Sequence, residues 1–244
     1  MIGTVAFTSE LKAQASIRDS SISMVLIAPS YAYQLPEGDM AKRFGSNSSV
    51  GLYVTVKRKS KWMFSAEANY IFGGRLNQTG IFSGITTSQG VVIGSDGYYG
   101  DIRVYERGYY GTLSVGRLFP VKKPNPNCGF FVQAGVGFMQ HKIRIEDKKH
   151  SVPELDGAYV KGYDHLSNGI CLREFAGYLY TGNHRLVNFF GGFEMVQGFT
   201  QNRRSYNFNT DAPEKTHRLD LLFGFRIGWI MPLYKEAPDK YYIY

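Results

Sequence analysis

The chain has 244 residues, of which 43% are hydrophobic and 15% aromatic, with 28 Gly and 18 Tyr. It contains no run of 18 apolar residues, which excludes a transmembrane helix, and so many aromatic residues exclude a disordered coil. Two cysteines are too few for a disulfide scaffold. The net charge of +8 indicates an anionic neighbour, either nucleic acid or an anionic lipid surface.

The N-terminal residues carry part of a processing signal. Ala13-Gln14-Ala15 fits the small-x-small pattern that precedes a signal-peptidase cleavage site. The apolar run from Ile2 to Phe7 is short, and no Lys or Arg precedes it. We therefore interpret residues 1–15 as the remnant of a secretory signal, with an ordinary polar N-terminal segment as the alternative.

Apolar and polar residues alternate with period two through most of the chain, which is typical of strands. The predicted strands are 22–35, 48–57, 61–72, 103–118, 129–145, 168–181, 185–202 and 217–234. Their connections alternate in length. Long ones at 36–47, 73–102, 146–167 and 203–216 alternate with short ones at 58–60, 120–128 and 182–184.

This alternation of connections is typical of outer-membrane barrels, which have long extracellular loops and short periplasmic turns. We therefore predict that residues 20–234 form an all-β, eight-stranded antiparallel up-and-down transmembrane β-barrel. An even number of strands places both termini in the periplasm. The predicted location is the bacterial outer membrane.

The two faces of the predicted strands support a membrane barrel. In the last strand the odd positions from Leu219 to Leu233 are all apolar, whereas most even positions carry charge or glycine. A water-soluble barrel with the opposite facing is the alternative. The many glycines on the polar faces suit a crowded interior, and strands of ten or more residues match a tilted bilayer span.

Charged residues on the polar faces should fill the barrel interior, because eight strands leave room only for side chains. Buried charges must be paired, and we interpret this set as a structural polar plug, with a proton or ion relay as the alternative. The set is Glu67, Glu106, Glu194, Arg218, Asp220 and Arg226. Arg173 and Glu174 are adjacent, so one of them faces lipid or a bulge intervenes.

The sequence lacks the P-loop, zincin and nucleophile-elbow motifs, so we expect no cofactor, no metal and no enzymatic activity. Basic runs such as Lys57-Arg58-Lys59 lack interleaved aromatics, which favours lipid head groups over nucleic acid. One stretch, His165-Leu166-Ser167-Asn168, resembles the His-x-Ser-Asn signature of lipid A deacylases. That resemblance implies an alternative function, an acyl hydrolase with His165 and Ser167 as catalytic residues and Glu174 as the nearest acid.

A broader resemblance covers roughly residues 20–234. It rests on four motifs: Gly38-Asp39-Met40-Ala41-Lys42-Arg43-Phe44-Gly45, Tyr105-Glu106-Arg107-Gly108, Leu118-Phe119-Pro120 followed by Pro124-Asn125-Pro126-Asn127, and Trp229-Ile230-Met231-Pro232-Leu233-Tyr234. With these motifs the chain resembles small outer-membrane barrels of Bacteroidota. The resemblance implies an accessory subunit of an outer-membrane machine, such as the barrel-assembly (BAM) complex or the type IX secretion apparatus.

We therefore predict a non-catalytic barrel that acts as a scaffold or accessory subunit of a larger outer-membrane protein complex. Outer-membrane lipids and lipopolysaccharide are the other expected partners, and nucleic acid is not one. A free-standing lipid-stabilising or adhesive barrel is a further alternative. Residues 235–244 form a predicted periplasmic extension, because the apolar alternation ends near Tyr234. The residues expected at a partner or membrane interface are Trp229, Tyr234, Tyr241, Tyr242 and Tyr244.

Overall fold

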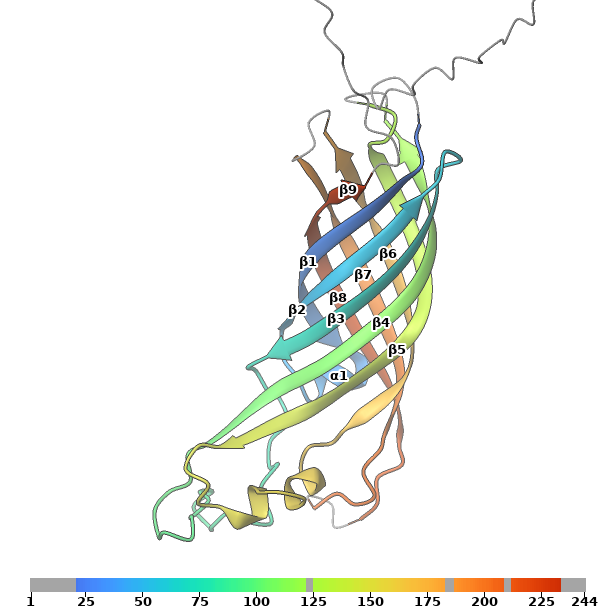
Figure 1. The fold of residues 1–244 in the computed structure, drawn as a ribbon. Coiled ribbons are helices and arrows are strands. Elements are labelled where there is room, and N and C mark those ends of the chain that lie inside the picture. The colour runs from blue at the N-terminus through green and yellow to red at the C-terminus, as the bar shows by residue number, and fades with distance from the viewer. Residues whose placement is uncertain (1–20, 122–124, 183–186, 209–211, 234–244) are drawn as a thin grey trace, which may run out of the picture.

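The computed structural model describes residues 21–121, 125–182, 187–208 and 212–233. Eight long antiparallel strands form a closed ring (Figure 1). They are β1 (Met24–Glu37), β2 (Asn47–Lys57), β3 (Trp62–Gly73), β4 (Ile102–Pro120), β5 (Gly129–Asp147), β6 (Ser167–Thr181), β7 (Asn188–Asn202) and β8 (His217–Trp229). The prediction of an eight-stranded up-and-down barrel is confirmed, with most strand boundaries within a few residues of those expected.

The ring closes through β1, which pairs with β2 on one side and with β8 on the other. Closure gives each of the eight long strands a hydrogen-bonded neighbour on both sides, as a lipid environment requires. The predicted last strand, 217–234, is interrupted at Ile230. The Ile230 amide donates to the Asn188 carbonyl (2.9 Å), and pairing with β1 then resumes as β9 (Met231–Leu233).

Long connections lie at one end of the barrel and short turns at the other (Figure 1). The first long loop contains the short helix α1 (Gly38–Ala41), and the third contains the single turns η1 (Pro153–Leu155) and η2 (Tyr159–Gly162). The predicted alternation of connection lengths is confirmed. Within the ranges described above, no helix has the length and hydropathy needed to cross a membrane.

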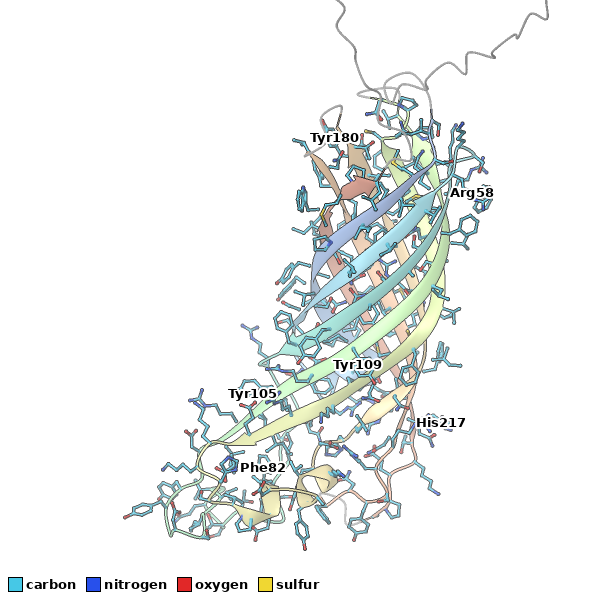
Figure 2. The ribbon with its side chains drawn as sticks, in the orientation of Figure 1. Arg58, Phe82, Tyr105, Tyr109, Tyr180 and His217 are labelled. Carbon is cyan, nitrogen blue, oxygen red and sulfur yellow. The ribbon has the colours of Figure 1, made fainter. Side chains whose placement is uncertain are left out.

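Side chains that point outward are apolar along the strands, as predicted. They include Phe64, Tyr70, Val115, Val132, Phe138, Phe193, Phe223 and Phe225, all exposed. Aromatic side chains lie near both ends of this surface: Tyr180 is at the turn end, and Tyr105 and Tyr109 are toward the loop end (Figure 2). An apolar belt between two aromatic borders is the surface of a transmembrane barrel.

Side chains that point inward form layers. An apolar cluster fills the turn end and contains Leu26, Met63, Leu118, Phe131, Phe175 and Phe190. A second fills the loop end and contains Met40, Phe44, Ile71, Met139, Cys171 and Leu222. The strand pattern predicts an interior dominated by charge and glycine. The apolar layers are not visible in it, because an apolar residue on a mostly polar face leaves the pattern intact.

The facing of β6 is also settled. Its pairing with β7 runs without a bulge from Ser167 opposite Asn202 to Thr181 opposite Asn188. Arg173 points inward and is 1% exposed, so its neighbour Glu174 points outward. Of the two alternatives left open by the sequence, a charged residue facing lipid is the correct one.

Candidate functional site

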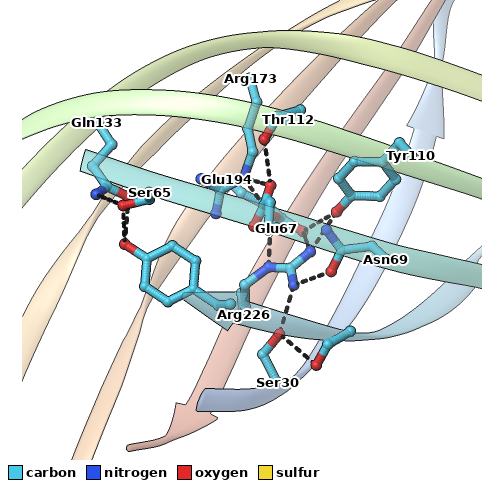
Figure 3. Close-up of polar contacts among 12 residues, drawn as sticks. Ser30, Ser65, Glu67, Asn69, Tyr110, Thr112, Gln133, Arg173, Glu194 and Arg226 are labelled. Atoms are coloured by element: carbon cyan, nitrogen blue, oxygen red, sulfur yellow. Dashed lines mark hydrogen bonds and ion pairs between the residues drawn. The ribbon is translucent and has the colours of Figure 1, made fainter. Parts of the chain in front are cut away.

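A cluster of ions lies at the middle of the barrel, between the two apolar layers (Figure 3). At its centre Arg226 of β8 faces Glu194 of β7. The Arg226 Nε lies 2.8 Å from Glu194 Oε2, and Nη2 lies 3.0 Å from Oε1. Two parallel N–H···O contacts of this kind form the strongest class of charged hydrogen bond.

Arg173 of β6 joins the central pair to a second carboxylate. Its Nε lies 2.8 Å from Glu67 Oε1 and 3.4 Å from Glu194 Oε2, and all three side chains are buried. The guanidinium also lies 5.1 Å from the centre of the Phe175 ring. Two arginines therefore face two glutamates, so the cluster is electrically balanced, as burial of charge requires.

Neutral side chains satisfy much of the remaining hydrogen-bonding capacity of these ions. Arg226 donates to Ser30 Oγ (2.8 Å), to Asn69 Oδ1 (2.6 Å) and to the Tyr110 hydroxyl. Gln34 donates to Glu194 (2.9 Å), and Thr112 donates to Glu67 (2.8 Å). Because the ions and their neutral partners together come from six of the eight strands, the network links most of the ring (Figure 3).

A second polar group lies nearer the loop end. His141 Nε2 lies 2.8 Å from Asp220 Oδ2, which also accepts from Thr200 Oγ1. The Glu106 carboxylate accepts from the Asn47 amide at 3.0 and 3.1 Å. The predicted interior set is thus divided by the structure. Glu67, Glu194 and Arg226 are in the central cluster, whereas Glu106 and Asp220 belong to this outer group.

Arg218 is the one member of the predicted set at the barrel mouth. It pairs with Glu214 from the loop that precedes β8, and its side chain is 15% exposed. Burial raises the pKa of Glu214, but the hydrogen bond from Asn202 and the charge of Arg218 outweigh this effect and hold it below its usual range. The Glu214 carboxylate is therefore ionised at neutral pH.

Arg43, which follows α1, reaches across the mouth to the segment before β6. Its Nη1 donates to the His165 carbonyl (3.2 Å) and to Ser167 Oγ (3.3 Å). Burial, with nearby Arg218 as the second cause, lowers the pKa of Arg43 to about 10, so it stays charged at neutral pH. Burial, with the charge of Arg43 second, also lowers the pKa of His165. A buried neutral imidazole thus lies between a cation and a carboxylate.

The hydrolase alternative requires His165 to activate Ser167, and the side chains are not arranged that way. Ser167 Oγ donates to the backbone carbonyl of His165 (3.1 Å), while the imidazole Nδ1 lies 3.7 Å from Glu214. The suggested acid, Glu174, is wrong. It is seven positions from Ser167, so the two side chains point to opposite sides of the barrel wall.

Sequence reasoning missed three residues that organise these clusters, namely Arg173, Tyr110 and Arg43. Residue parity identifies Tyr110, which shares the inward face of its strand with Glu106. Parity alone could not place Arg173, because charged residues occupy both faces of β6 at that point. Arg43 lies outside the strands, so only the path of the loop brings it to Ser167.

The predicted interface residues are only partly described. Trp229 is 49% exposed on the outer surface at the end of β8, where the turns lie. Tyr234, Tyr241, Tyr242 and Tyr244 lie outside the described residues, as do the predicted signal remnant 1–15 and the extension 235–244. Among the residues that are described, no three or more His, Cys, Asp and Glu side chains are grouped to hold a metal ion.

The closed ring of eight antiparallel strands defines the class of this protein as a small transmembrane β-barrel. No protein-family model and no curated protein sequence matches the chain. Solved structures are similar to it at low identity. Neisserial surface protein A is 12% identical, with a TM-score of 0.44, over 84% of this chain and 96% of that one.

Two further structures are similar over most of their length. The outer membrane protein OprG from Pseudomonas aeruginosa is 11% identical, with a TM-score of 0.44, over 88% of this chain and 99% of that one. Ail, the attachment invasion locus protein of Yersinia pestis, was solved with the heparin analogue sucrose octasulfate. It is 10% identical, with a TM-score of 0.41, over 86% and 99% of the two chains.

Proposed function

We propose that this protein is a non-catalytic, non-conducting barrel of the bacterial outer membrane that serves as a scaffold or accessory subunit of a larger outer-membrane assembly. The observation that carries the proposal is the layered interior. Two apolar clusters enclose the ion cluster of Arg173, Arg226, Glu67 and Glu194, all buried and mutually paired. Such an interior resists unfolding and offers no path for a solute.

In this proposal the long loops face the cell exterior and both termini face the periplasm. Charge at the loop end supports this orientation. Arg107 and Lys142 are directly opposite each other on β4 and β5. Like charges across a strand pair are unfavourable unless an anion lies near them. The phosphates of lipopolysaccharide in the outer leaflet supply that charge.

The accessory role is supported by the loop surface. The loops pack on one another through three aromatic rings. The ring centre of Tyr163 lies 5.9 Å from that of Phe82 and 5.1 Å from that of Phe208. On this packed base Tyr98, Tyr99 and Tyr159 remain between 66% and 71% exposed. Exposed tyrosines on a fixed base suit the recognition of a protein partner. The motifs that resemble Bacteroidota barrels favour a barrel-assembly or type IX secretion machine as the assembly.

Conductance measurement tests the sealed interior. The purified protein, inserted into planar lipid bilayers, should give no unit current steps at either polarity. An established outer-membrane porin inserted under the same conditions serves as the positive control. Reproducible steps from the wild-type protein would contradict the non-conducting proposal.

Co-purification tests the accessory role separately. The protein extracted from native membranes in mild detergent should carry a stoichiometric outer-membrane partner. Replacing Tyr98, Tyr99 and Tyr159 by Ala should reduce recovery of that partner at least tenfold, whereas Tyr70→Ala on the lipid-facing surface should leave recovery unchanged. Capture of no outer-membrane protein, or equal recovery with all variants, would contradict the accessory role.

A further inference from the structure

One ionisable side chain lies on the lipid-facing surface at the middle of the barrel. Glu174 is the central residue of β6 (Ser167–Thr181) and points outward, beside Ala134 on β5 and Met195 on β7. Gln197 of β7 also points outward, and its amide donates to both Glu174 oxygens at 3.2 and 3.3 Å. Ionisable groups are costly inside a bilayer and mark sites of function there.

The surface around this pair is hollowed. A groove of about 660 Å³ is lined by Ala134, Ala176 and Glu174, together with larger side chains that include Trp62, Arg117, Phe193 and Phe223. The surface is recessed at Ala134 and Ala176 because their side chains are shorter than those of the neighbouring residues. Phe193, directly opposite Ala176 on β7, is 72% exposed and lines the groove. A projecting ring therefore lies next to a depression whose small side chains are the two alanines.

We propose that this face of β5 to β8 is the docking surface for a second copy of this chain within the membrane. Two copies in one membrane are related by a two-fold axis along the membrane normal, and such an axis preserves depth. The Glu174 and Gln197 pair of one copy then meets the same pair of the other. Each Gln197 amide has two N–H groups and can donate one of them to the Glu174 carboxyl of the other copy, so the pair complements itself.

The shape of the surface is complementary to itself in the same way. When the polar pairs meet at the axis, the Phe193 ring of each copy faces the alanine groove of the other. Small residues allow membrane-embedded segments to approach closely. A lipid acyl chain could fill the groove but offers Glu174 no hydrogen bond, whereas the second copy satisfies both features at once.

Cysteine cross-linking in native membranes tests the contact. Met195 is directly opposite Glu174 and two residues before Gln197 on the outer surface, so Met195→Cys should form a disulfide-linked dimer when the membranes are oxidised. Ala66→Cys on β3, which faces lipid on another side of the barrel, should remain monomeric. No dimer from Met195→Cys, equal cross-linking from both positions, or a product with a different protein would overturn the proposal.

Self-association of the purified protein in lipid vesicles tests the chemistry. Glu174→Leu should weaken dimerisation at least tenfold, whereas Glu174→Gln, which keeps a hydrogen-bonding amide, should stay within threefold of wild type. Phe193→Ala should weaken it similarly, and Phe64→Ala on β3 should have no effect. The heat-dependent gel shift of each variant shows that its barrel has folded. A monomeric wild type, or dimerisation insensitive to Glu174→Leu, would overturn the proposal and would show that lipid alone covers this surface.

Discussion

Arg226 and Glu194 are joined across neighbouring strands by two hydrogen bonds of 2.8 and 3.0 Å, at a level of the barrel that water does not reach. Apolar clusters lie on both sides of this level. The pair is therefore isolated from solvent. The charge of the whole cluster is balanced by its other two members, Arg173 and Glu67. This balance leads to a stability prediction.

Arg226→Leu should destabilise the barrel by about 3–5 kcal/mol. It leaves two buried carboxylates, Glu67 and Glu194, with one cation of the cluster, Arg173, to balance them. Urea unfolding in lipid vesicles, followed by tryptophan fluorescence, measures the change. Arg58→Leu, at an exposed turn position, should cost less than about 1 kcal/mol. The double variant Glu194→Leu with Arg226→Leu should recover part of the loss, because Glu67 and Arg173 then balance each other. No recovery would show that charge balance is not the cause.

Gly137→Ala should prevent or severely impair barrel assembly. A Cβ at Gly137 would lie 1.9 Å from the Gly111 carbonyl oxygen, which belongs to the backbone of the paired strand. Relief requires β4 and β5 to separate, at a cost of about 3 kcal/mol or more. The measurement is the fraction of protein that shows a heat-dependent gel shift after refolding.

Gly191→Ala is the matched control for this substitution. A Cβ at Gly191 would lie 3.5 Å from Ile227 Cγ2, an ordinary contact, so this variant should refold like wild type. Equal refolding of the two glycine variants would show that the close approach of β4 and β5 is not limiting.

Acidification should loosen the loop end of the barrel through His165. Burial, followed by the charge of Arg43, holds the pKa of His165 below its ordinary value of 6.5. The unfolded chain therefore takes up a proton on this histidine at a higher pH than the folded chain does. Stability falls as pH decreases below about 6.5 and stops falling below the folded pKa. The folded pKa of Glu214 is also lowered, so its carboxylate stays ionised until lower pH.

Protease sensitivity of the loop between β3 and β4 measures this effect. Cleavage in residues 74–101 should be faster at pH 5 than at pH 7.5 in the wild type. His165→Gln, which cannot take up the proton, should show a smaller difference between the two pH values. An unchanged difference would assign the pH dependence to other groups.

Ser167→Ala should affect the loop end without affecting lipid A. The hydroxyl accepts from Arg43, and its loss leaves a buried guanidinium short of one acceptor, at a cost of about 1–3 kcal/mol. Ser49→Ala, at a buried hydroxyl on β2 for which the structure shows no hydrogen bond, should cost less than about 1 kcal/mol. Mass spectrometry should find the same acyl chains on lipid A in cells with either variant. A change in the acyl chains of lipid A with Ser167→Ala, and not with Ser49→Ala, would support the hydrolase.

Period-two alternation and the lengths of the connections determined the architecture from sequence alone. Both are local properties. Odd and even positions of a strand point to opposite sides of the barrel wall, and the number of residues between two strands gives the length of the loop. The outward apolar face from Leu219 to Trp229 and the inward glutamates Glu67 and Glu194 could therefore be predicted. The same rule was ambiguous at the adjacent charges Arg173 and Glu174, and it did not reveal the apolar layers inside the barrel.

Which charges meet was decided only by the tertiary structure. Glu67 and Arg173 are 106 positions apart in the chain, and Arg43 and Ser167 are 124 apart. Contacts between such distant residues depend on ring closure, strand stagger and the path of each loop. None of these is encoded by a local pattern. The balanced cluster at the centre, the neutral His165 at the mouth and the outward position of Glu174 all follow from that closure, because pairing of β1 with β8 fixes the register of every strand between them.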